Sequence, residues 1–142
     1  VEEGLSKTRY LKAGSLVFAN CGVSLGFARI LAIDGCIHDG WLAFNDIDEV
    51  KVNKIFLLKA LNSITRHFRE TAPDGTQPNL NTGLMKSFKL IIPPMDLQLA
   101  FEAVVSSISE QRVHLVCATE ASDDLFASLQ SDAFAGTLSS YA

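Results

Sequence analysis

Between residues 15 and 44 the chain alternates short apolar runs with polar turns, a pattern typical of β-strands. The runs are SLVFA (15–19), GFARILAI (26–33) and WLAF (41–44), and turns containing glycine or aspartate separate them. Strands this short, with turns this frequent, predict a compact, mainly antiparallel sheet. Trp41, with Leu42 and Phe44 nearby, is expected in the core rather than on a stacking surface.

The next segment, NKIFLLKALNSITRHF (53–68), has the period of an amphipathic helix. Asn53 is placed to cap its N-terminus, and Arg66 and Arg69 lie near its end, beside a polar loop. The apolar positions recur at i, i+4, i+7 and i+11, which is one face of the helix: Leu57, Leu61, Ile64 and Phe68.

A polar loop, ETAPDGTQPNLNTG (70–83), follows this helix. Its prolines and glycines favour turns, and its Asn and Thr side chains can bond their own backbone there. The apolar run FKLII (88–92) then predicts another strand. A double proline ends that strand, because a residue that precedes proline is steered away from helical angles.

From Asp96 the pattern changes to that of one long helix. No proline or glycine interrupts residues 95–135, and Gly136 is well placed to end the helix. Seven of the ten seam positions of a heptad repeat are apolar, which predicts a coiled coil. The a positions are Phe101, Ile108, Leu115, Ser122 and Leu129, and the d positions are Val104, Gln111, Ala118, Leu125 and Asp132.

We expect this helix to need a partner. About 36 residues make a rod of about 54 Å, which is longer than a small domain is wide. The apolar stripe needs another helix, and nothing else in the chain has the length. The pattern predicts a homodimer through an antiparallel coiled coil of residues 96–132, in which polar Gln111 and Ser122 can fix the register. Packing of the stripe against the preceding domain is the alternative.

Together these elements predict an α+β protein in two functional parts. Residues 1–93 are expected to form part of a small β-rich domain, and residues 94–142 to form the long helix with a short tail. With 48% apolar residues among 142, the chain should fold. It begins with Val1 rather than Met, which suggests a fragment of a longer protein.

Cysteine usage and hydropathy narrow the class of protein. Cys21, Cys36 and Cys117 are scattered and odd in number, which argues against a disulfide framework or a zinc ribbon. That usage suits a reducing cytoplasm. No apolar run approaches the roughly 20 residues of a membrane span, and no signal peptide is visible. We therefore expect a cytoplasmic protein without a membrane partner.

The net charge of −4 hides an asymmetry between the two parts. Residues 1–93 carry 11 Lys or Arg and 9 Asp or Glu, whereas residues 94–142 carry one base and 7 acids. The basic part is the candidate for binding a polyanion, because DNA affinity needs cations at the phosphates. The candidate DNA-binding cations are Lys7, Arg9, Lys12, Arg66, Arg69, Lys86 and Lys89. Each could instead be a solvated surface cation.

Two long segments resemble a known family. GTQPNLNTGLMKSFKLIIPPMDLQ (75–98), followed by a heptad helix ending in LFASLQSDAFAGTL (125–138), is similar to the specificity subunit of type I restriction–modification systems. In that family a target-recognition domain closes with a G-T-Q loop and a Pro-Pro motif, and a long helix follows. The matching residues are Gly75, Thr76, Gln77, Asn79, Asn81, Pro93, Pro94, Gln98, Leu125, Phe126, Ser128, Leu129, Phe134 and Gly136. The segment YLKAGSLVFANCGVSLGFARI (10–30) also fits the family.

The resemblance implies a DNA sequence-recognition subunit that is not itself a catalyst. A full subunit has two recognition domains, each reading one half of a split site in double-stranded DNA, and two helices that pack antiparallel and set their separation. It assembles with modification subunits, which use S-adenosylmethionine, and with a restriction subunit, which uses ATP and magnesium. No cofactor is expected on this chain itself.

The loop GTQPNLN (75–81) admits two interpretations. Because family members that read different sequences share it, we expect it to shape the domain through its own side-chain hydrogen bonds. Base reading is the alternative, since an amide suits adenine, and Gln77 is its candidate.

Two other functions stay open. One is a coiled-coil protein-interaction module without DNA binding, and the other is a fragment of a methyltransferase. Against an enzyme, no catalytic or phosphate-binding motif is present, and the histidines have no metal-ligand spacing with any cysteine. These histidines are His38, His67 and His114. The salt dependence of DNA binding would separate a recognition subunit from an interaction module.

Overall fold

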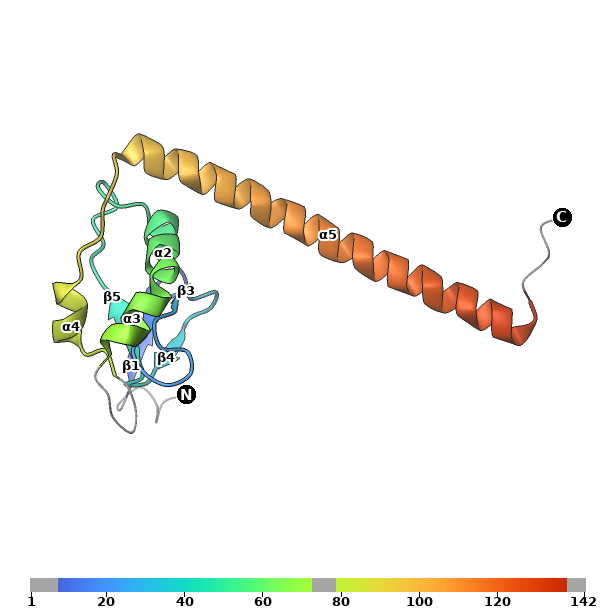
Figure 1. Ribbon diagram of the computed structural model, residues 1–142, viewed down its shortest axis with the longest axis horizontal. Helices are drawn as coiled ribbons and strands as arrows, with labels where there is room; N and C mark the ends of the chain where they lie inside the picture. The colour runs from blue at the N-terminus through green and yellow to red at the C-terminus, as the bar shows by residue number, and fades with distance from the viewer. Residues whose placement is uncertain (1–7, 73–78, 138–142) are drawn as a thin grey trace. The chain divides into compact units, whose positions relative to one another are not determined.

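The computed structural model describes residues 8–72 and 79–137 (Figure 1). The chain divides into two compact units, Val1–Phe101 and Glu102–Ala142. The described residues form five short strands and four helices, which confirms the predicted α+β class with a long C-terminal helix. The division into functional parts at residue 93 stays a prediction.

A three-stranded antiparallel sheet forms the centre of the first unit. Its order is β3 (Ala28–Ile30), β2 (Leu16–Ala19) and β5 (Trp41–Phe44). Phe18 lies opposite Ala28 on one side and Leu42 on the other. All four residues of β2 are buried, as befits the central strand. The antiparallel sheet is confirmed, although β3 is shorter than the predicted 26–33.

A second, two-stranded antiparallel sheet pairs β1 (Arg9–Leu11) with β4 (Gly35–Ile37). The apolar pattern did not predict it, since β4 lies in a segment expected to be a turn. Two hydrogen bonds beside this sheet join the segments that lead into and out of it. The Asp34 carboxylate accepts from the Tyr10 hydroxyl at 2.6 Å and from the Ala13 backbone N–H at 2.8 Å.

The predicted helix over 53–68 is wrong in one respect, because the chain forms two helices there. They are α2 (Lys54–Ser63) and α3 (Thr65–Thr71), and Ile64 between them has non-helical angles (φ −108°, ψ 18°). After the break, the Thr65 hydroxyl donates to the Gly26 carbonyl at 2.9 Å. A Cβ on Gly26 would lie 3.0 Å from Thr65, so the break lets α3 lie directly on the turn after β2. The N-cap is as predicted, since the Asn53 side chain accepts from the Phe56 backbone N–H at 2.9 Å.

Aromatic side chains from three segments meet in the core. Phe68 of α3 packs edge-on against Phe18 of β2, with ring centroids 5.0 Å apart, and against Phe88 at 4.6 Å. Phe18 and Phe68 are fully buried. Aromatic rings bury large apolar areas, so this cluster contributes strongly to holding α3, the sheet and the segment at Phe88 together.

The predicted strand over 88–92 is wrong, because this segment is extended but pairs with no described strand. A short helix, α4 (Thr82–Ser87), precedes it, capped by the Asn81 side chain. Phe88 and Leu90 pack on the core, whereas Ile91 is 90% exposed. Side-chain packing thus holds the segment in place, and its backbone takes no part in a sheet.

The long helix α5 (Met95–Ala135) begins within the first unit, where Gln98 is fully buried. The Gln98 Oε1 accepts from the Asn53 backbone N–H at 2.8 Å. Its Nε2 donates to the carbonyls of Lys51 at 3.0 Å and Pro93 at 2.7 Å. The amide therefore binds the first turn of α5 to the segment before α2 and to the proline pair.

The predicted limits of the long helix are confirmed. It runs without a break to Ala135, and Gly136 ends it with a positive φ of 71° while its backbone N–H donates to the Ala133 carbonyl. Every residue from 106 to 137 is exposed. Among the described residues, no helix has the length and apolar character to span a bilayer.

Candidate nucleic-acid interface

Arg9 and Lys86 line one groove between the edge strand β5 and helix α4. The groove has a volume of about 620 Å³. Its other walls come from Asp39, Trp41, Leu42, Ala43, Phe44, Asn45, Thr82, Met85 and Phe88. Neither cation forms an ion pair with any residue in the described ranges. Two of the predicted DNA-binding cations, far apart in sequence, are thus brought together with their charges available.

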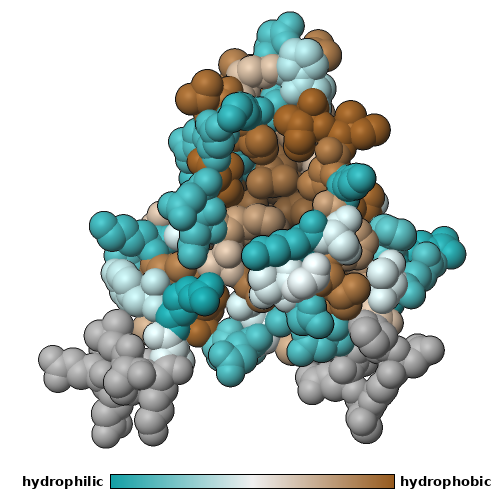
Figure 2. Space-filling view, turned by 90° about the vertical axis from the view of Figure 1, so that its left-hand side faces the viewer, coloured by the Kyte–Doolittle hydropathy of each residue, from teal (hydrophilic) through white to brown (hydrophobic). Residues whose placement is uncertain are grey.

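The groove combines apolar walls with polar side chains. On the side of the first unit where α4 lies, apolar side chains gather in a central hollow and polar side chains frame it (Figure 2). Trp41, expected in the core, is only half-buried and faces this groove. An aromatic ring, the Asn45 amide and two cations are the side-chain types that bind bases and phosphates. Sequence reasoning missed Trp41 and Asn45 because their proximity to Arg9 depends on how the two sheets meet.

Arg69 is engaged within the first unit. Its Nε donates to the Leu25 carbonyl at 3.0 Å and its Nη2 to the Val23 carbonyl at 3.1 Å. Arg66 is exposed and paired with Glu70 at 2.7 Å. Arg69 therefore orders the turn between β2 and β3, and a neighbouring carboxylate offsets the charge of Arg66.

The remaining cations are dispersed. Lys12 is exposed at the turn after β1. Lys89 lines a different cavity, of about 740 Å³, with His67 and Phe88. Lys7 and Gln77 lie outside the described residues. The structure therefore brings together one pair of the predicted cations, and the DNA-contacting role of each residue stays a prediction.

The described part of the GTQPNLN loop acts within the fold. The Asn79 side chain accepts from the Asn20 side chain at 3.3 Å, and the Leu80 backbone N–H donates to the Asn20 carbonyl at 2.8 Å. Leu80 itself is fully buried. The Asn81 side chain accepts from the Leu84 backbone N–H at 2.9 Å. These contacts support the interpretation that this part of the loop shapes the domain.

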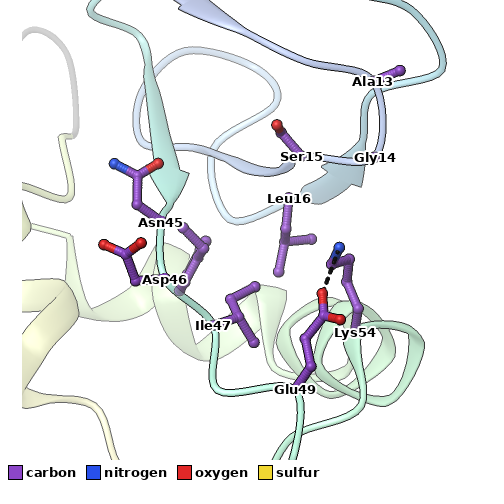
Figure 3. A pocket seen from close by; sticks show the side chains of 10 residues that line it. Ala13, Gly14, Ser15, Leu16, Asn45, Asp46, Ile47, Glu49 and Lys54 are labelled. Atoms are coloured by element: carbon purple, nitrogen blue, oxygen red, sulfur yellow. Dashed lines mark ion pairs between the residues drawn. The ribbon is translucent and has the colours of Figure 1, made fainter.

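A third cavity, of about 590 Å³, lies between the start of β2, the end of β5 and the start of α2 (Figure 3). Asp46 and Glu49 line it together with one cation, Lys54, which is paired with Glu49 at 3.0 Å. Its lining therefore carries a net negative charge, which opposes binding of a polyanion.

The predicted seam of α5 is exposed along its length. Val104 is 57% exposed, Ile108 51% and Leu115 67%. The first seam residue, Phe101, also packs edge-on against Phe56 of α2, with centroids 5.9 Å apart. A row of exposed apolar side chains on one helix is the surface that a partner helix would bury.

The charged residues of α5 lie off this seam, except Asp132 at its last d position. Its acids up to residue 131 occupy the outer heptad positions b, c and f: Asp96, Glu102, Glu110, Glu120, Asp123 and Asp124. The flanking e and g positions carry one charge, Arg112, and small residues such as Ala121 and Ser128. Two copies of α5 could therefore approach closely without opposing like charges at the flanks.

No protein-family model matches the chain. A search of solved structures finds the S subunit of a type I restriction–modification system from M. genitalium. The match has a TM-score of 0.63 and covers 74% of this chain at 18% sequence identity. The chain has the fold of one part of a type I specificity subunit. This confirms, for the fold, the resemblance that the motifs indicated.

The S-subunit fold extends beyond this chain. The chain spans 28% of the length of the M. genitalium S subunit. At 18% identity the similarity concerns the fold, so the residues that contact a ligand must be argued from this chain's own side chains.

Proposed function

We propose that this chain is the DNA-recognition part of a type I restriction–modification specificity subunit, reading one half of a bipartite site. The observation that carries the proposal is the S-subunit fold, in which a β-rich unit and one long helix are continuous. The groove supports it, because cations are needed at the phosphates and neither Arg9 nor Lys86 is ion-paired within residues 8–72 and 79–137.

The role is binding and scaffolding in the cytoplasm. In this proposal, modification subunits supply the methyl transfer from S-adenosylmethionine, and a restriction subunit uses ATP and magnesium. Among residues 8–72 and 79–137, no group of three or more His, Cys, Asp or Glu could hold a metal ion. The side chains of this chain contribute affinity and sequence preference.

A salt titration tests DNA binding. The subunit containing this chain, assembled with its modification subunits, should bind its site with log K falling linearly against log salt concentration. Replacing both cations (Arg9→Gln with Lys86→Gln) should reduce the slope by about 2, since each phosphate contact contributes about 0.9. Lys51→Gln, at an exposed lysine paired with Asp48, is the matched control and should keep the slope. Unchanged slopes in the double variant would remove the groove from the interface, and binding independent of salt would refute DNA recognition.

We propose further that the seam of α5 pairs with a second copy in an antiparallel register. In antiparallel coiled coils an a residue of one helix packs against a d residue of the other. Aligning Leu115 with Ala118 of the second copy also aligns Ile108 with Leu125 and Val104 with Leu129. In this register each of these apolar residues meets an apolar residue.

Two of the three polar seam residues support the same register, whereas the third, Asp132, faces Phe101 of the second copy. Gln111 then faces Ser122 of the second copy, so polar meets polar. Moving the register by one heptad in either direction places Gln111 against Leu115 or Leu129. A parallel pair would instead place Asp132 against Asp132, two carboxylates at one seam position. The antiparallel register avoids both mismatches.

Disulfide trapping distinguishes these arrangements. In a background where Cys21, Cys36 and Cys117 are serine, Gln111→Cys and Ser122→Cys proteins should cross-link when mixed and fail to do so separately. A parallel pair would cross-link each variant alone. Glu110→Cys, on the outer face, is the control and should not cross-link. Absence of any cross-link in the mixture would refute the register.

The alternative function is a coiled-coil interaction module without DNA binding. The exposed seam favours it as much as it favours a recognition subunit. The two cations of the groove favour recognition, because a module acting through α5 alone does not need them.

A further inference from the structure

The turn between β2 and β3 has a tightly ordered backbone. The Leu25 N–H donates to the Gly22 carbonyl at 3.0 Å, and the Gly26 N–H donates to the Ala19 carbonyl at 2.9 Å. Gly22 and Gly26 have positive φ values of 70° and 89°, which glycine adopts without strain. The Leu25 side chain is buried in the core and anchors the turn from below. The tip at Val23 is therefore held in one conformation.

One guanidinium group lies beside this tip, and a second lies near Phe27, just before β3. Arg69 donates to the carbonyls of Val23 and Leu25, so its charge sits next to the turn. Arg69 and Arg29 each lie 5.2 Å from the centroid of the Phe27 ring. Neither forms an ion pair with a described residue. Arg69 thus places a positive charge at the tip, and Arg29 adds a second positive charge near Phe27.

Val23 is 96% exposed at the end of this turn. Single exposed apolar residues are ordinary on protein surfaces, so exposure alone indicates nothing. Val50 is also exposed, at 84%, but it follows two acidic residues, Asp48 and Glu49. Val23 differs in having a fixed backbone, the Arg69 guanidinium bonded to its carbonyl and Arg29 near Phe27, a combination that suits an anionic surface carrying apolar groups.

Duplex DNA has that chemistry. Its major groove is about 12 Å wide, and the C5-methyl group of thymine is the apolar group displayed there. Phosphates line both edges of the groove and attract arginine. A tight turn with one branched apolar side chain at its tip can enter such a groove, and a fixed backbone loses little conformational entropy on binding.

We propose that the Gly22–Gly26 turn enters the major groove of the recognised half-site and that Val23 contacts the methyl group of a thymine. Arg29 and Arg69 then face the phosphates at the groove edges. This inference rests on the proposed function and adds a specificity-determining residue to it. The exposed Ser24 hydroxyl, next in the chain, is also available to a base edge.

Deoxyuridine substitution tests the contact. The assembled subunit is bound to its recognition duplex, and each thymine is replaced in turn by deoxyuridine, which lacks only the C5-methyl group. The wild-type protein should lose about fourfold in affinity at one position, the factor expected for burying one methyl-sized group. In Val23→Ala the affinity for the unmodified duplex should fall by a similar factor, and the deoxyuridine effect at that position should disappear.

Val50→Ala is the matched control, as an exposed valine that follows two acidic residues, and should retain the wild-type response. The inference is overturned by a wild-type protein indifferent to every deoxyuridine, by a half-site without thymine, or by Val23→Ala keeping the full deoxyuridine effect. In each of these outcomes sequence-specific binding by the wild type leaves the proposed function intact. If the wild-type protein shows no sequence-specific DNA binding, the proposed recognition function itself is contradicted.

Discussion

Replacing Gln98 tests how the long helix is attached to its domain. Gln98→Leu keeps the approximate volume and leaves three backbone groups without their amide partner: the Asn53 N–H and the carbonyls of Lys51 and Pro93. At about 1 kcal/mol for each lost hydrogen bond, the first unit should lose about 3 kcal/mol of unfolding free energy. Since a domain of this size is stable by about 5–10 kcal/mol, that is a large fraction.

Urea unfolding followed by tryptophan fluorescence measures this loss. Trp41 is the one tryptophan of the sequence and lies in β5, so the signal reports on the first unit. With a slope of about 1.5 kcal/mol per molar urea, the midpoint should fall by about 2 M. Gln130→Leu replaces an exposed glutamine of α5 and should change the free energy by less than about 0.5 kcal/mol.

A second substitution separates loss of hydrogen bonds from loss of shape. Gln98→Glu keeps an acceptor for Asn53 but points a carboxylate at two carbonyl oxygens, which raises the pKa of the introduced group. Its stability contribution should be present at low pH, where the neutral acid donates a proton, and be lost as pH rises through that pKa. If Gln98→Leu costs less than about 1 kcal/mol, or if Gln98→Glu shows no pH dependence beyond that of the wild type, the amide does not anchor the helix.

Two further predictions concern the seam and the small sheet. Replacing Ile108 and Leu115 together by aspartate should turn dimers into monomers in light scattering, because each dimer would bury four carboxylates at the seam; a wild-type chain that is monomeric at high concentration would show that the seam is misinterpreted. The pKa of Asp34 is lowered mainly by the hydrogen bond from the Tyr10 hydroxyl and next by the hydrogen bond from the Ala13 N–H. The ionised Asp34 should therefore stabilise the fold above about pH 4, and this contribution should be lost as pH falls further. The same hydrogen bond raises the pKa of Tyr10, so stability should also fall above about pH 10. Asp34→Asn should weaken both dependences in thermal unfolding measured against pH, and unaltered profiles would refute the assignment.

The elements that the sequence predicts correctly are those in which one local pattern decides the structure. The long helix is the clearest case, since 41 residues without glycine or proline and a following Gly136 leave few alternatives to a single helix. The three central strands are predicted for a similar reason, because glycine and aspartate turns bound each apolar run.

Tertiary contacts decide the elements that the sequence predicts wrongly. The helix breaks at Ile64 because Thr65 bonds to Gly26, about forty residues earlier in the chain. The run at 88–92 has the composition of a strand, but the Phe88 ring packs against Phe68 and the segment does not pair with the described sheets. In neither segment does the local sequence reveal the partner.

The candidate site shows the same division. The residue types at Arg9 and Lys86 make them candidates for DNA contact, but only the fold places both on one groove. Arg69 has the same residue type and proves to be bonded to the turn it orders. Val23 belongs to no recognisable sequence motif. Its exposure and its neighbours in the fold, rather than its residue type, make it a candidate for DNA contact.

The nearly uncharged flanks of α5 have a consequence for how such chains evolve. Because charge pairs at e and g do not select the partner, a helix of this kind would pair with any copy that preserves the same seam. The sequence of the domain attached to that copy would not matter. On the proposed function, two chains that have diverged in the bases they prefer would still assemble, and the mixed pair would bind a composite target that neither parent recognises. New target sequences would then arise by recombining existing halves, without a coordinated change at the joint.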